Sequence, residues 1–442
     1  MTWSYAEAYA YIKSLGSNRT RSVQYDTLHY SLERPIALLK LLGRPDYRMH
    51  IIHVAGTKGK GSTSVYMANA LQAAGYRVGL HTTPHLHTFR ERFVINGVLI
   101  SEAEFASLME RLKPVADLVG AEVGFGPPTE HEMCVAAVLW WFAERGADWA
   151  VIEVGVGGRL DSTNVVNPEA AVVTPVSLDH MNLLGPTITS ISTQKAGIIK
   201  PGRLAISAWQ QPDAAAVLRA RAAEVGAPLF MLGEEARFEV DVENALRVQT
   251  PWGALSRLQV PLIGDHQYEN AAVAVTTLAA LRGTGRLALS DEEIRLGIAR
   301  TKWPARFEII QDNPLTILDG AHNDDSLGKL DQTLRQHARG KKIVVFATPS
   351  DKAIDSMMRI LARLADYTIF TDRPGALLPV ATEQCMAEMR ALGVPHERAL
   401  DPIEGFRRAT AMAGNGDSVV VTGSLALCAD VRAYIKHVPQ DL

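Results

Sequence analysis

The sequence predicts an α/β protein in which mainly parallel sheets are surrounded by helices. From Met49 onward, short apolar runs alternate with longer helix-forming runs, the order expected when parallel strands are joined by crossover helices. At 442 residues the chain exceeds the usual size of one domain. A second alternating series begins near Phe307, just after a linker-like segment at 301–306. We therefore predict a larger domain over residues 1–300 and a smaller, Rossmann-like α/β domain over residues 307–442.

The larger domain begins with helices. Residues 4–44 have helical patterns, with a polar, arginine-bearing connection at Ser17–Ser22. The predicted strands that follow are HIIHVAG, RVGLHTTP, ADWAVIEVG, EAAVVTPVSL and GRLAISAW. The apolar run from Met133 to Ala143 is too short to span a bilayer and predicts a buried helix.

Residues 236–264 have a different pattern, because apolar and polar residues alternate around a turn at Trp252-Gly253. This pattern predicts antiparallel hairpins on a sheet edge. A helix is expected from Asn270 to Arg282. The predicted strands of the smaller domain are LTILDG, KKIVVFATP, DYTIFTD and DSVVVTGS.

The composition is that of a globular protein, with 47% hydrophobic and 21% charged residues. A net charge of −3 gives no general electrostatic reason to bind nucleic acid or an anionic membrane. The first residues, MTWSYAEAYAYIK, do not resemble a signal peptide. Three widely spaced cysteines suit a reducing compartment and form neither a disulfide framework nor a metal cluster. We expect a cytoplasmic monomer with small-molecule partners.

The most informative stretch is residues 51–71, IIHVAGTKGKGSTSVYMANAL. A strand, a glycine-rich turn and a helix start form a cradle for anions, since backbone N–H groups and the helix dipole point at one place. The residues expected to form this cradle are Gly56, Gly59, Lys60, Gly61 and Ser62. The spacing departs from G-x-x-x-x-G-K-[ST], so a lysine-rich surface turn is the alternative.

Polar residues follow two of the predicted strands, where ligands of α/β proteins bind. Glu153 ends one strand and is a candidate Mg²⁺ ligand, with a capping or ion-pairing role as the alternative. Asp179 and His180 end the next strand, and His180 has either a metal or phosphate role or a structural one. Lys195 lies among small and apolar residues, which indicates a buried lysine that must be paired, neutralised or modified.

Further candidates lie near and beyond the linker. Asn270 has either a helix-capping role, which the local sequence favours, or a role in reading an adenine edge. Arg306 is a candidate for stabilising a transferred phosphate, with an interdomain salt bridge as the alternative. Asp319 and His322 occupy a strand-to-helix turn. For them the alternatives are a helix cap and a packed loop histidine.

Eight segments, taken in this order, resemble the folylpolyglutamate synthase/dihydrofolate synthase branch of the Mur ligase superfamily. They are HVAGTKGKGS, LHTTPHLHTFRERFVING, VIEVGVGGRLDSTNVV, LDHMNLLGPTITSISTQKAGIIKPG, GDHQYENA, WPARFE, ILDGAHNDDS and VVVTGSL. They extend from His53 to Leu425 and so cover most of the chain. The unusual loop spacing GTKGKGS is itself similar to the family's form.

The resemblance implies a Mur-ligase-like fold with an ATP-binding larger domain and a glutamate-ligase smaller domain. It implies that ATP phosphorylates a carboxylate of dihydropteroate or of a folate, and that the amino group of L-glutamate attacks the acyl phosphate. ADP and phosphate are then released. Phosphorylation supplies the leaving group that a carboxylate lacks, and Mg²⁺ with Lys60 offsets charge repulsion.

The resemblance also implies roles for individual residues. ATP is expected to contact Thr57, Gly59, Lys60, Gly61, Ser62, Asn270, Arg306 and Asp319. Mg²⁺ is expected at Ser62, Glu153 and His180. Lys195 matches a carbamylated lysine, and the catalytic set implied is Lys60, His180, Lys195 and His322. The substrate side is expected to include Thr83, Pro84, His85, Arg92, His322 and Ser424. A K⁺ ion is a possible further cofactor.

The chain departs from the family pattern at three places. Thr83 replaces the usual serine, and Met181-Asn182 replaces the usual residues after His180. Glu130 and His131 replace aromatic residues just before Glu132, near the expected pterin side. Two other functions stay open at this point, and the altered Glu130 and His131 support the first of them. One is the same ligase chemistry on a non-folate acceptor, and the other is a nucleotide-driven switch or ATPase.

Overall fold

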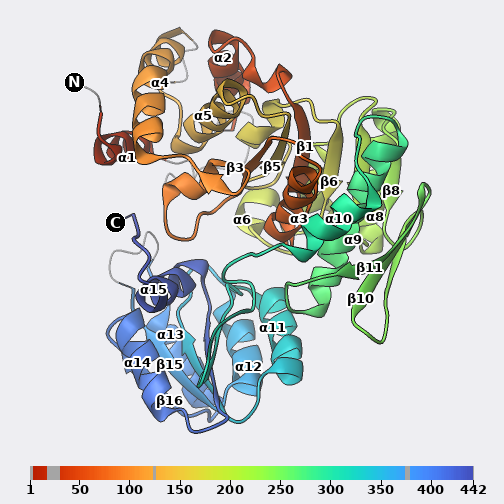
Figure 1. Ribbon diagram of the computed structural model, residues 1–442. Coiled ribbons are helices and arrows are strands. Elements are labelled where there is room, and N and C mark those ends of the chain that lie inside the picture. The colour runs from red at the N-terminus through yellow and green to blue at the C-terminus, as the bar shows by residue number, and fades with distance from the viewer. Residues whose placement is uncertain (1–2, 17–29, 123–125, 374–378, 442) are drawn as a thin grey trace. The chain divides into compact units, whose positions relative to one another are not determined.

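The computed structural model describes residues 3–16, 30–122, 126–373 and 379–441 (Figure 1). The chain forms two compact units. The first comprises Met1–His85, Phe89–Pro261 and Tyr268–Thr301, and the second comprises Leu86–Thr88, Leu262–Gln267 and Lys302–Leu442. Two short segments from early and middle parts of the chain thus belong with the second unit. The predicted connection at Ser17–Ser22 lies outside the described residues.

The first unit is built on an eight-stranded sheet. Its strands, in spatial order, are β4 (Val98–Leu99), β3 (Val94–Ile95), β2 (Val78–His81), β5 (Trp149–Glu153), β1 (His50–Ala55), β6 (Ala170–Val173), β7 (Leu204–Ser207) and β8 (Leu229–Met231). Every pairing from β2 across to β8 is parallel, and the two pairings of β3, with β2 and with β4, are antiparallel. The predicted parallel sheet is confirmed, and its central strands are buried as their continuous apolar sequences require.

Helices surround this sheet (Figure 1). They are α1 (Tyr5–Ser14), α2 (Glu33–Leu41), α3 (Lys60–Ala73), α4 (Glu102–Glu122), α5 (Glu130–Glu144), α6 (Met181–Leu184), α7 (Ile188–Ala196), α8 (Pro212–Glu224), α9 (Asp265–Gly283) and α10 (Asp291–Ala299). The first three residues of α9 count with the second unit. Short 3-10 helices are η1 (Pro45–Tyr47), η2 (Phe89–Arg92) and η3 (Ser162–Val165).

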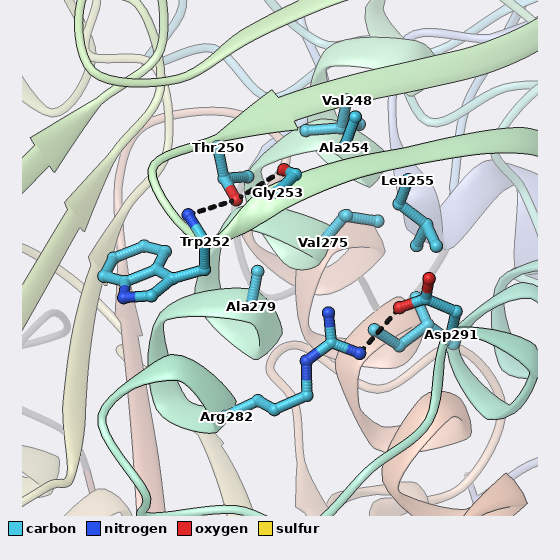
Figure 2. A pocket seen from close by; sticks show the side chains of 11 residues that line it. Val248, Thr250, Trp252, Gly253, Ala254, Leu255, Val275, Ala279, Arg282 and Asp291 are labelled. Carbon is cyan, nitrogen blue, oxygen red and sulfur yellow. Dashed lines mark hydrogen bonds and ion pairs between the residues drawn. The ribbon is translucent and has the colours of Figure 1, made fainter.

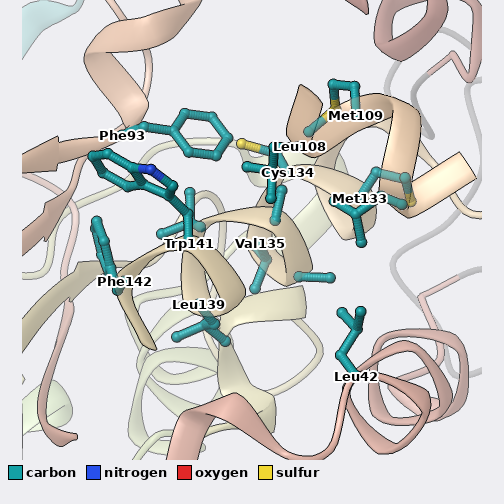
Figure 3. Packing of buried hydrophobic residues seen from close by; sticks show 14 of the residues in the cluster. Leu42, Phe93, Leu108, Met109, Met133, Cys134, Val135, Leu139, Trp141 and Phe142 are labelled. Carbon is teal, nitrogen blue, oxygen red and sulfur yellow. The ribbon is translucent and has the colours of Figure 1, made fainter. Parts of the chain in front are cut away.

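The predicted buried helix is α5, which is longer than the apolar run at both ends. Thr129 caps its first turn in a capping box with Glu132. Its apolar side chains pack in one cluster with those of α1, α2 and α4. Figure 3 shows Trp141 and Cys134 of α5 beside Phe93 and Met109 in this cluster. Packing in this cluster holds α5 against the sheet and so positions the residues at the N-terminus of α5.

The predicted location of residues 236–264 at the edge of a sheet is wrong. These residues form a separate three-stranded antiparallel sheet of β9 (Arg237–Val240), β10 (Ala245–Thr250) and β11 (Gly253–Gln259). The apolar residues on one face, such as Val248 and Leu258, are buried, and β11 packs against α10. The hairpin therefore buries its apolar face against helices rather than pairing with β8.

The second unit has a six-stranded sheet. Its strands, in spatial order, are β12 (Glu308–Asp312), β13 (Leu315–Leu318), β17 (Ser418–Thr422), β14 (Lys342–Phe346), β15 (Tyr367–Thr371) and β16 (His396–Ala399). Only β12 pairs antiparallel. The helices are α11 (Asp324–His337), α12 (Ile354–Leu364), α13 (Thr382–Ala391), α14 (Pro402–Met412) and α15 (Leu425–Lys436). The four predicted strands are confirmed, whereas both edge strands, β12 and β16, were missed.

Two general expectations can be compared with the described residues. No helix in them combines the length and the apolar character that crossing a bilayer requires. Cys134, Cys385 and Cys428 are all buried free thiols. The cysteines are therefore packing residues of the two cores.

Candidate functional site

The glycine-rich loop follows β1 and is held against the segment that follows β6. Gly56 has a φ of +145°, and a side chain there would collide with Thr174. The backbone N–H of Thr57 donates to the carbonyl of Pro175 at 3.0 Å. The Thr57 hydroxyl donates to the carbonyl of Ser177 at 3.1 Å and accepts from its N–H at 3.1 Å. These contacts fix the path of the loop and require glycine where it passes Thr174.

The loop ends at the N-terminus of α3, as predicted. Gly59 is the N-cap, with a φ of +83°, and Lys60 is the first residue of the helix. Gly61 lies in the first turn, and Ser62 there is buried. Because Gly59 has no side chain to cap the helix, the first N–H groups of α3 are left for an external acceptor. The local structure is that of an anion-binding helix terminus.

Asn270 faces this loop, and the capping role favoured for it is wrong. Helix α9 begins at Asp265, so Asn270 lies in its second turn rather than at its start. Asn270 is buried, and a side chain at Gly59 would collide with its amide. The Asn270 amide therefore lies against the glycine-rich loop at Gly59.

Two lysines of the loop face carboxylates at the strand ends. The Lys58 ammonium lies 3.1 Å from Asp179 Oδ2, and the Lys60 ammonium lies 3.9 Å from Glu153 Oε1. Glu153 ends β5 and is buried, and its Oε2 accepts a hydrogen bond from the Thr83 N–H at 3.1 Å. The structure thus brings Lys60, Glu153 and Thr83 together. Lys58 was not among the predicted site residues, although it lies in the quoted loop motif.

Lys195 is buried behind the loop, as predicted. Its ammonium donates to the carbonyl of Gly56 at 2.8 Å. Burial lowers the pKa of Lys195 well below its ordinary value, and the nearby charges of Lys60 and Lys58 lower it further, while Asp179 opposes the shift. A buried amine of this kind is readily neutral and can act as a nucleophile.

His180 does not end a strand. Strand β6 stops at Val173, and His180 is the N-cap of the short helix α6, with a φ of +50°. Its backbone N–H donates to Asp179 Oδ1 at 3.0 Å. The loop between β6 and α6 thus carries Asp179, which pairs with Lys58, and His180 directly after it.

The expected substrate-side loop is tied to the start of α5. Arg92 Nε donates to His85 Nδ1 at 3.1 Å, and Arg92 Nη1 lies 3.8 Å from Glu130 Oε1. Lys13 also pairs with Glu130, at 2.8 Å. Pro84 is exposed. The structure therefore brings His85 and Arg92 together, and the Glu130 carboxylate lies close to the Arg92 guanidinium.

A buried polar network beside this region was not predicted. His131 Nε2 lies 3.2 Å from both carboxylate oxygens of Asp161, and Asp161 accepts a 2.6 Å hydrogen bond from the Thr163 hydroxyl. The Thr163 hydroxyl also lies 2.9 Å from His53 Nε2. Burial alone would raise the pKa of Asp161, but His131 and these hydrogen bonds hold it well below its ordinary value. His131 was identified in the sequence as a departure from the family pattern, but its pairing with Asp161 was not predicted.

The second unit places Asp319 and His322 in one turn, and Arg306 packs against that turn. Asp319, which follows β13, accepts hydrogen bonds from the N–H groups of Phe307 at 2.8 Å and Ala321 at 2.9 Å. His322 Nδ1 lies 2.8 Å from the carbonyl of Gly320, which packs closely against Arg306. Burial raises the pKa of Asp319, although Arg306 and the two N–H groups oppose the shift.

The capping role considered for Asp319 is wrong, because Asn323 caps α11. Ser424 is the N-cap of α15, and its hydroxyl accepts from the Leu427 N–H at 3.2 Å. Leu425, the next residue, packs against Gly320. Ser424 therefore begins a helix close to the Asp319–His322 turn.

Comparison with known proteins gives the same family from sequence and from structure. Residues 54–278 match the Mur ligase middle domain, and residues 305–425 match the Mur ligase glutamate ligase domain. The dihydrofolate synthase/folylpolyglutamate synthase of Bacillus subtilis is 35% identical over 414 residues, which cover 92% of this chain and 95% of that protein. The chain belongs to the folylpolyglutamate synthase/dihydrofolate synthase family.

Solved structures of this family are similar over almost the whole chain. Mycobacterium tuberculosis folylpolyglutamate synthase complexed with ADP has a TM-score of 0.89 at 28% identity, covering 99% of this chain and 100% of that one. Escherichia coli FolC in complex with DHPP and ADP has a TM-score of 0.86 at 30% identity, covering 98% of each chain. This folylpolyglutamate synthase/dihydrofolate synthase family member therefore has the Mur ligase fold and is an ATP-dependent acid–amino-acid ligase. The nucleotide-switch hypothesis is not favoured.

The donor set of this family member suits a metal ion that keeps water and phosphate ligands. Within the described ranges, no three or more His, Cys, Asp or Glu side chains are grouped so that they could hold a metal by themselves. A hydroxyl at Ser62 and a buried carboxylate at Glu153 do flank the helix terminus. Mg²⁺ is commonly bound by one or two carboxylates together with water and substrate phosphates, so these residues fit Mg²⁺.

Proposed function

We propose that this ligase joins L-glutamate to a folate-type carboxylate, that of dihydropteroate, of a tetrahydrofolate polyglutamate, or of both. The observation that carries the proposal is the uncapped N-terminus of α3 beside Lys60 and the buried Glu153, in a chain that matches the family over most of its length. This arrangement can hold the phosphates of ATP next to a metal-binding carboxylate.

The proposed reaction has two steps. First, a carboxylate oxygen of the acceptor attacks the γ-phosphorus of ATP, the bond from phosphorus to the β–γ bridging oxygen breaks, and ADP leaves. Next, the amino group of glutamate attacks the acyl carbon, inorganic phosphate leaves, and the amine loses a proton as the amide forms. Lys60 and the N–H groups of α3 are positioned to neutralise charge on the transferred phosphoryl group. Thr57, Gly59 and Gly61 would shape the loop around the phosphates.

We propose that Ser62, Glu153 and His180 would hold Mg²⁺ together with the phosphates of ATP. Mg²⁺ supplies charge neutralisation at the phosphates and orients them for transfer. In the structure Glu153 is already oriented by the Thr83 N–H, so its second carboxylate oxygen faces Lys60. Asn270 would contact ATP beside Gly59. A K⁺ ion remains a further proposal.

Carbamylation of Lys195 is also proposed. The reaction requires a neutral amine, and it converts a buried cation into an anionic group. The buried position of Lys195, its hydrogen bond to Gly56 and its lowered pKa support the proposal. The carbamate would then lie behind the loop that carries Lys58 and Lys60, and its charge would offset theirs.

The remaining assignments follow the family. We propose ATP binding for residues 1–300 and glutamate ligation for residues 307–442, with the linker at 301–306. Arg306 and Asp319 are proposed ATP contacts, and His322 and Ser424 are proposed to act on the glutamate side. Thr83, Pro84, His85 and Arg92 are proposed for the acceptor side. A cytoplasmic monomer with no nucleic-acid or membrane partner remains our expectation.

Phosphate release with a panel of acceptors tests the function. With Mg·ATP and L-glutamate present, dihydropteroate or tetrahydrofolate should stimulate release, and omitting glutamate should abolish amide formation. Failure of both acceptors would reject the folate assignment. Non-folate carboxylates belong in the panel, because Glu130, which lies 3.8 Å from Arg92 of the proposed acceptor loop, and its neighbour His131 depart from the family pattern. Stimulation by one of these alone would establish the alternative acceptor.

A further inference from the structure

A cavity lies under the three-stranded sheet of β9, β10 and β11, away from the glycine-rich loop after β1. It has a volume of about 200 Å³, is partly open to solvent, and is lined by the turn of the β10–β11 hairpin, by α9 and by the start of α10. Figure 2 shows Val275 and Ala279 of α9 and Leu255 of β11 around it, with Arg282 and Asp291 along one wall. All of these residues belong to the first unit. A pocket that opens to solvent can admit a small molecule.

The charged wall of the cavity has hydrogen-bonding capacity to spare. Arg282 Nη1 donates to Asp291 Oδ1 at 2.6 Å and, more weakly, to the carbonyl of Leu289 at 3.4 Å. Among the residues that the structure describes, Arg282 Nη2 has no hydrogen-bond acceptor and Asp291 Oδ2 has no donor. Both side chains are partly exposed, 32% for Arg282 and 45% for Asp291, so the pair by itself contributes little to stability. Here one guanidinium edge and one carboxylate oxygen remain available side by side.

The other walls are mostly apolar. Val248, Leu255, Val275, Ala279 and Ile294 line them. The Thr250 hydroxyl is already occupied, since it accepts from the Trp252 N–H and donates to the Gly253 carbonyl. An occupant therefore needs opposite charges at one end and an apolar body at the other.

The volume limits the size of the occupant. An engineered apolar cavity of about 150 Å³ holds benzene, whereas pockets for drug-sized ligands measure roughly 300–1,000 Å³. A cavity of about 200 Å³ is therefore too small for a nucleotide or a folate. It matches a molecule slightly larger than benzene.

We propose that this cavity is a regulatory site for a free apolar α-amino acid of about the size of leucine. The α-carboxylate would accept from Arg282 Nη2, the α-ammonium would donate to Asp291 Oδ2, and the side chain would contact Val275 and Leu255. The Arg282–Asp291 pair itself stays intact, because the ligand uses the atoms that the pair leaves free. A glutamate side chain would place a charge against the apolar wall, at a desolvation cost.

The position of the cavity connects it to the glycine-rich loop after β1. Helix α9 carries Ala279 and Arg282 at one end and Asn270, which packs against Gly59, toward the other. Helix α10 packs so closely on α3 that a side chain at Gly297 would collide with the backbone of Ala70. A ligand held between α9 and α10 is therefore expected to change the KM for ATP.

Calorimetric titration of the full-length protein with L-leucine tests the proposal. L-Leucine should bind, whereas L-leucinamide, which lacks the carboxylate, and N-acetyl-L-leucine, which lacks the ammonium, should bind at least about tenfold more weakly. L-Glutamate should compete weakly or not at all. Saturating L-leucine should also change the KM for ATP. No binding of L-leucine, or equal binding of all four compounds, would overturn the site, and binding with an unchanged KM would overturn its regulatory role.

Variants separate this site from general effects on the fold. Arg282→Gln and Asp291→Asn should each abolish the response to L-leucine. Ala279→Phe should fill the cavity and abolish binding while leaving basal ligase activity unchanged, so it controls for loss of the ion pair. Glu292→Gln is the matched charge control, because Glu292 is the neighbouring exposed acid on α10 and does not line the cavity. A leucine response retained in Ala279→Phe would contradict the proposal.

Discussion

Single residues set the shape of the glycine-rich loop after β1, and Gly59 sets it most directly. Its positive φ and its contact with the Asn270 amide each exclude a side chain. Gly75 has nearly the same φ, +86°, but among the described residues no neighbouring atom lies within 4 Å of the place that a Cβ would take. The two glycines therefore separate the effect of backbone strain from the effect of the collision.

Gly59→Ala should raise the KM for ATP by at least about tenfold, because the loop must move away from Asn270, whereas Gly75→Ala should cost only about 1 kcal/mol of stability. Steady-state kinetics and urea denaturation of both variants provide the measurements. A normal KM in folded Gly59→Ala would mean that the loop does not bind ATP in this conformation.

Lys195 is the second residue whose role can be tested alone. Lys195→Ala should lower kcat by at least about 100-fold, since the group proposed to balance the loop lysines is lost. Acetate or propionate should partly restore kcat if a carbamate is needed. Lys200→Ala is the matched control, because Lys200 is partly buried and also donates to a backbone carbonyl, that of Asn164, but lies outside the proposed site. An unchanged rate in Lys195→Ala would assign Lys195 a structural role.

At the scale of elements, helix α5 depends on a buried ion pair. Arg34 of α2 binds the Glu132 carboxylate through Nε and Nη2, each at 3.0 Å, and Glu132 also completes the capping box of α5. Arg111 and Glu144 form a second Arg–Glu pair, between α4 and α5, but both side chains are partly exposed. Helix α5 thus takes part in one buried and one partly exposed Arg–Glu ion pair.

Arg34→Ala should destabilise the protein by about 3 kcal/mol, because it leaves a buried carboxylate without its main partner. Arg111→Ala should cost less than about 1 kcal/mol, since exposed pairs contribute little. Urea titrations of the two variants give the free energies of unfolding to be compared. Equal losses in the two variants would show that the Arg34–Glu132 pair does not anchor α5.

The strands also show which parts of the fold could be predicted from the sequence. The central strands were predictable because burial on both faces requires continuous apolar runs, as in β5 and β17. The edge strand β16, with the sequence HERA, has no such requirement and was missed. The hairpin sheet was assigned to the wrong place, because local alternation does not reveal which partner covers the apolar face.

The same limit applies to the candidate site. The glycine-rich loop, the position of Glu153 at a strand end and the burial of Lys195 were predictable, since each depends only on neighbouring residues in the sequence. The contact between His53 and Thr163 joins residues 110 positions apart, and nothing in one sequence records such a pairing. Asn270 was misread as a cap because the start of α9 at Asp265 has no strong sequence signal.

At the scale of the whole molecule, buried histidines make stability depend on pH. Burial lowers the pKa of His53 to about 3 and that of His81 to about 4, while unfolded histidines titrate near 6.5. Between these values the unfolded chain binds more protons than the folded one. The stability that the neutral histidines contribute is therefore present above about pH 6.5 and is lost as the pH falls toward 4.

The free energy of unfolding should accordingly decrease by a few kcal/mol between pH 7 and pH 4.5. His81→Gln should reduce this dependence, whereas His437→Gln, at an exposed position, should leave it unchanged. Urea titrations across this pH range provide the measurement. Identical pH profiles for the wild type and His81→Gln would show that His81 is not held neutral by burial.

In the proposed reaction, the acceptor carboxylate is phosphorylated before glutamate attacks it. The most direct test uses an acceptor, dihydropteroate or tetrahydrofolate, whose carboxylate carries ¹⁸O. After reaction with Mg·ATP and L-glutamate, mass spectrometry should find one ¹⁸O atom in the released phosphate and a product one glutamyl unit longer. Unlabelled phosphate, or release of phosphate without the glutamyl product, would rule out an acyl phosphate intermediate on the path to the amide.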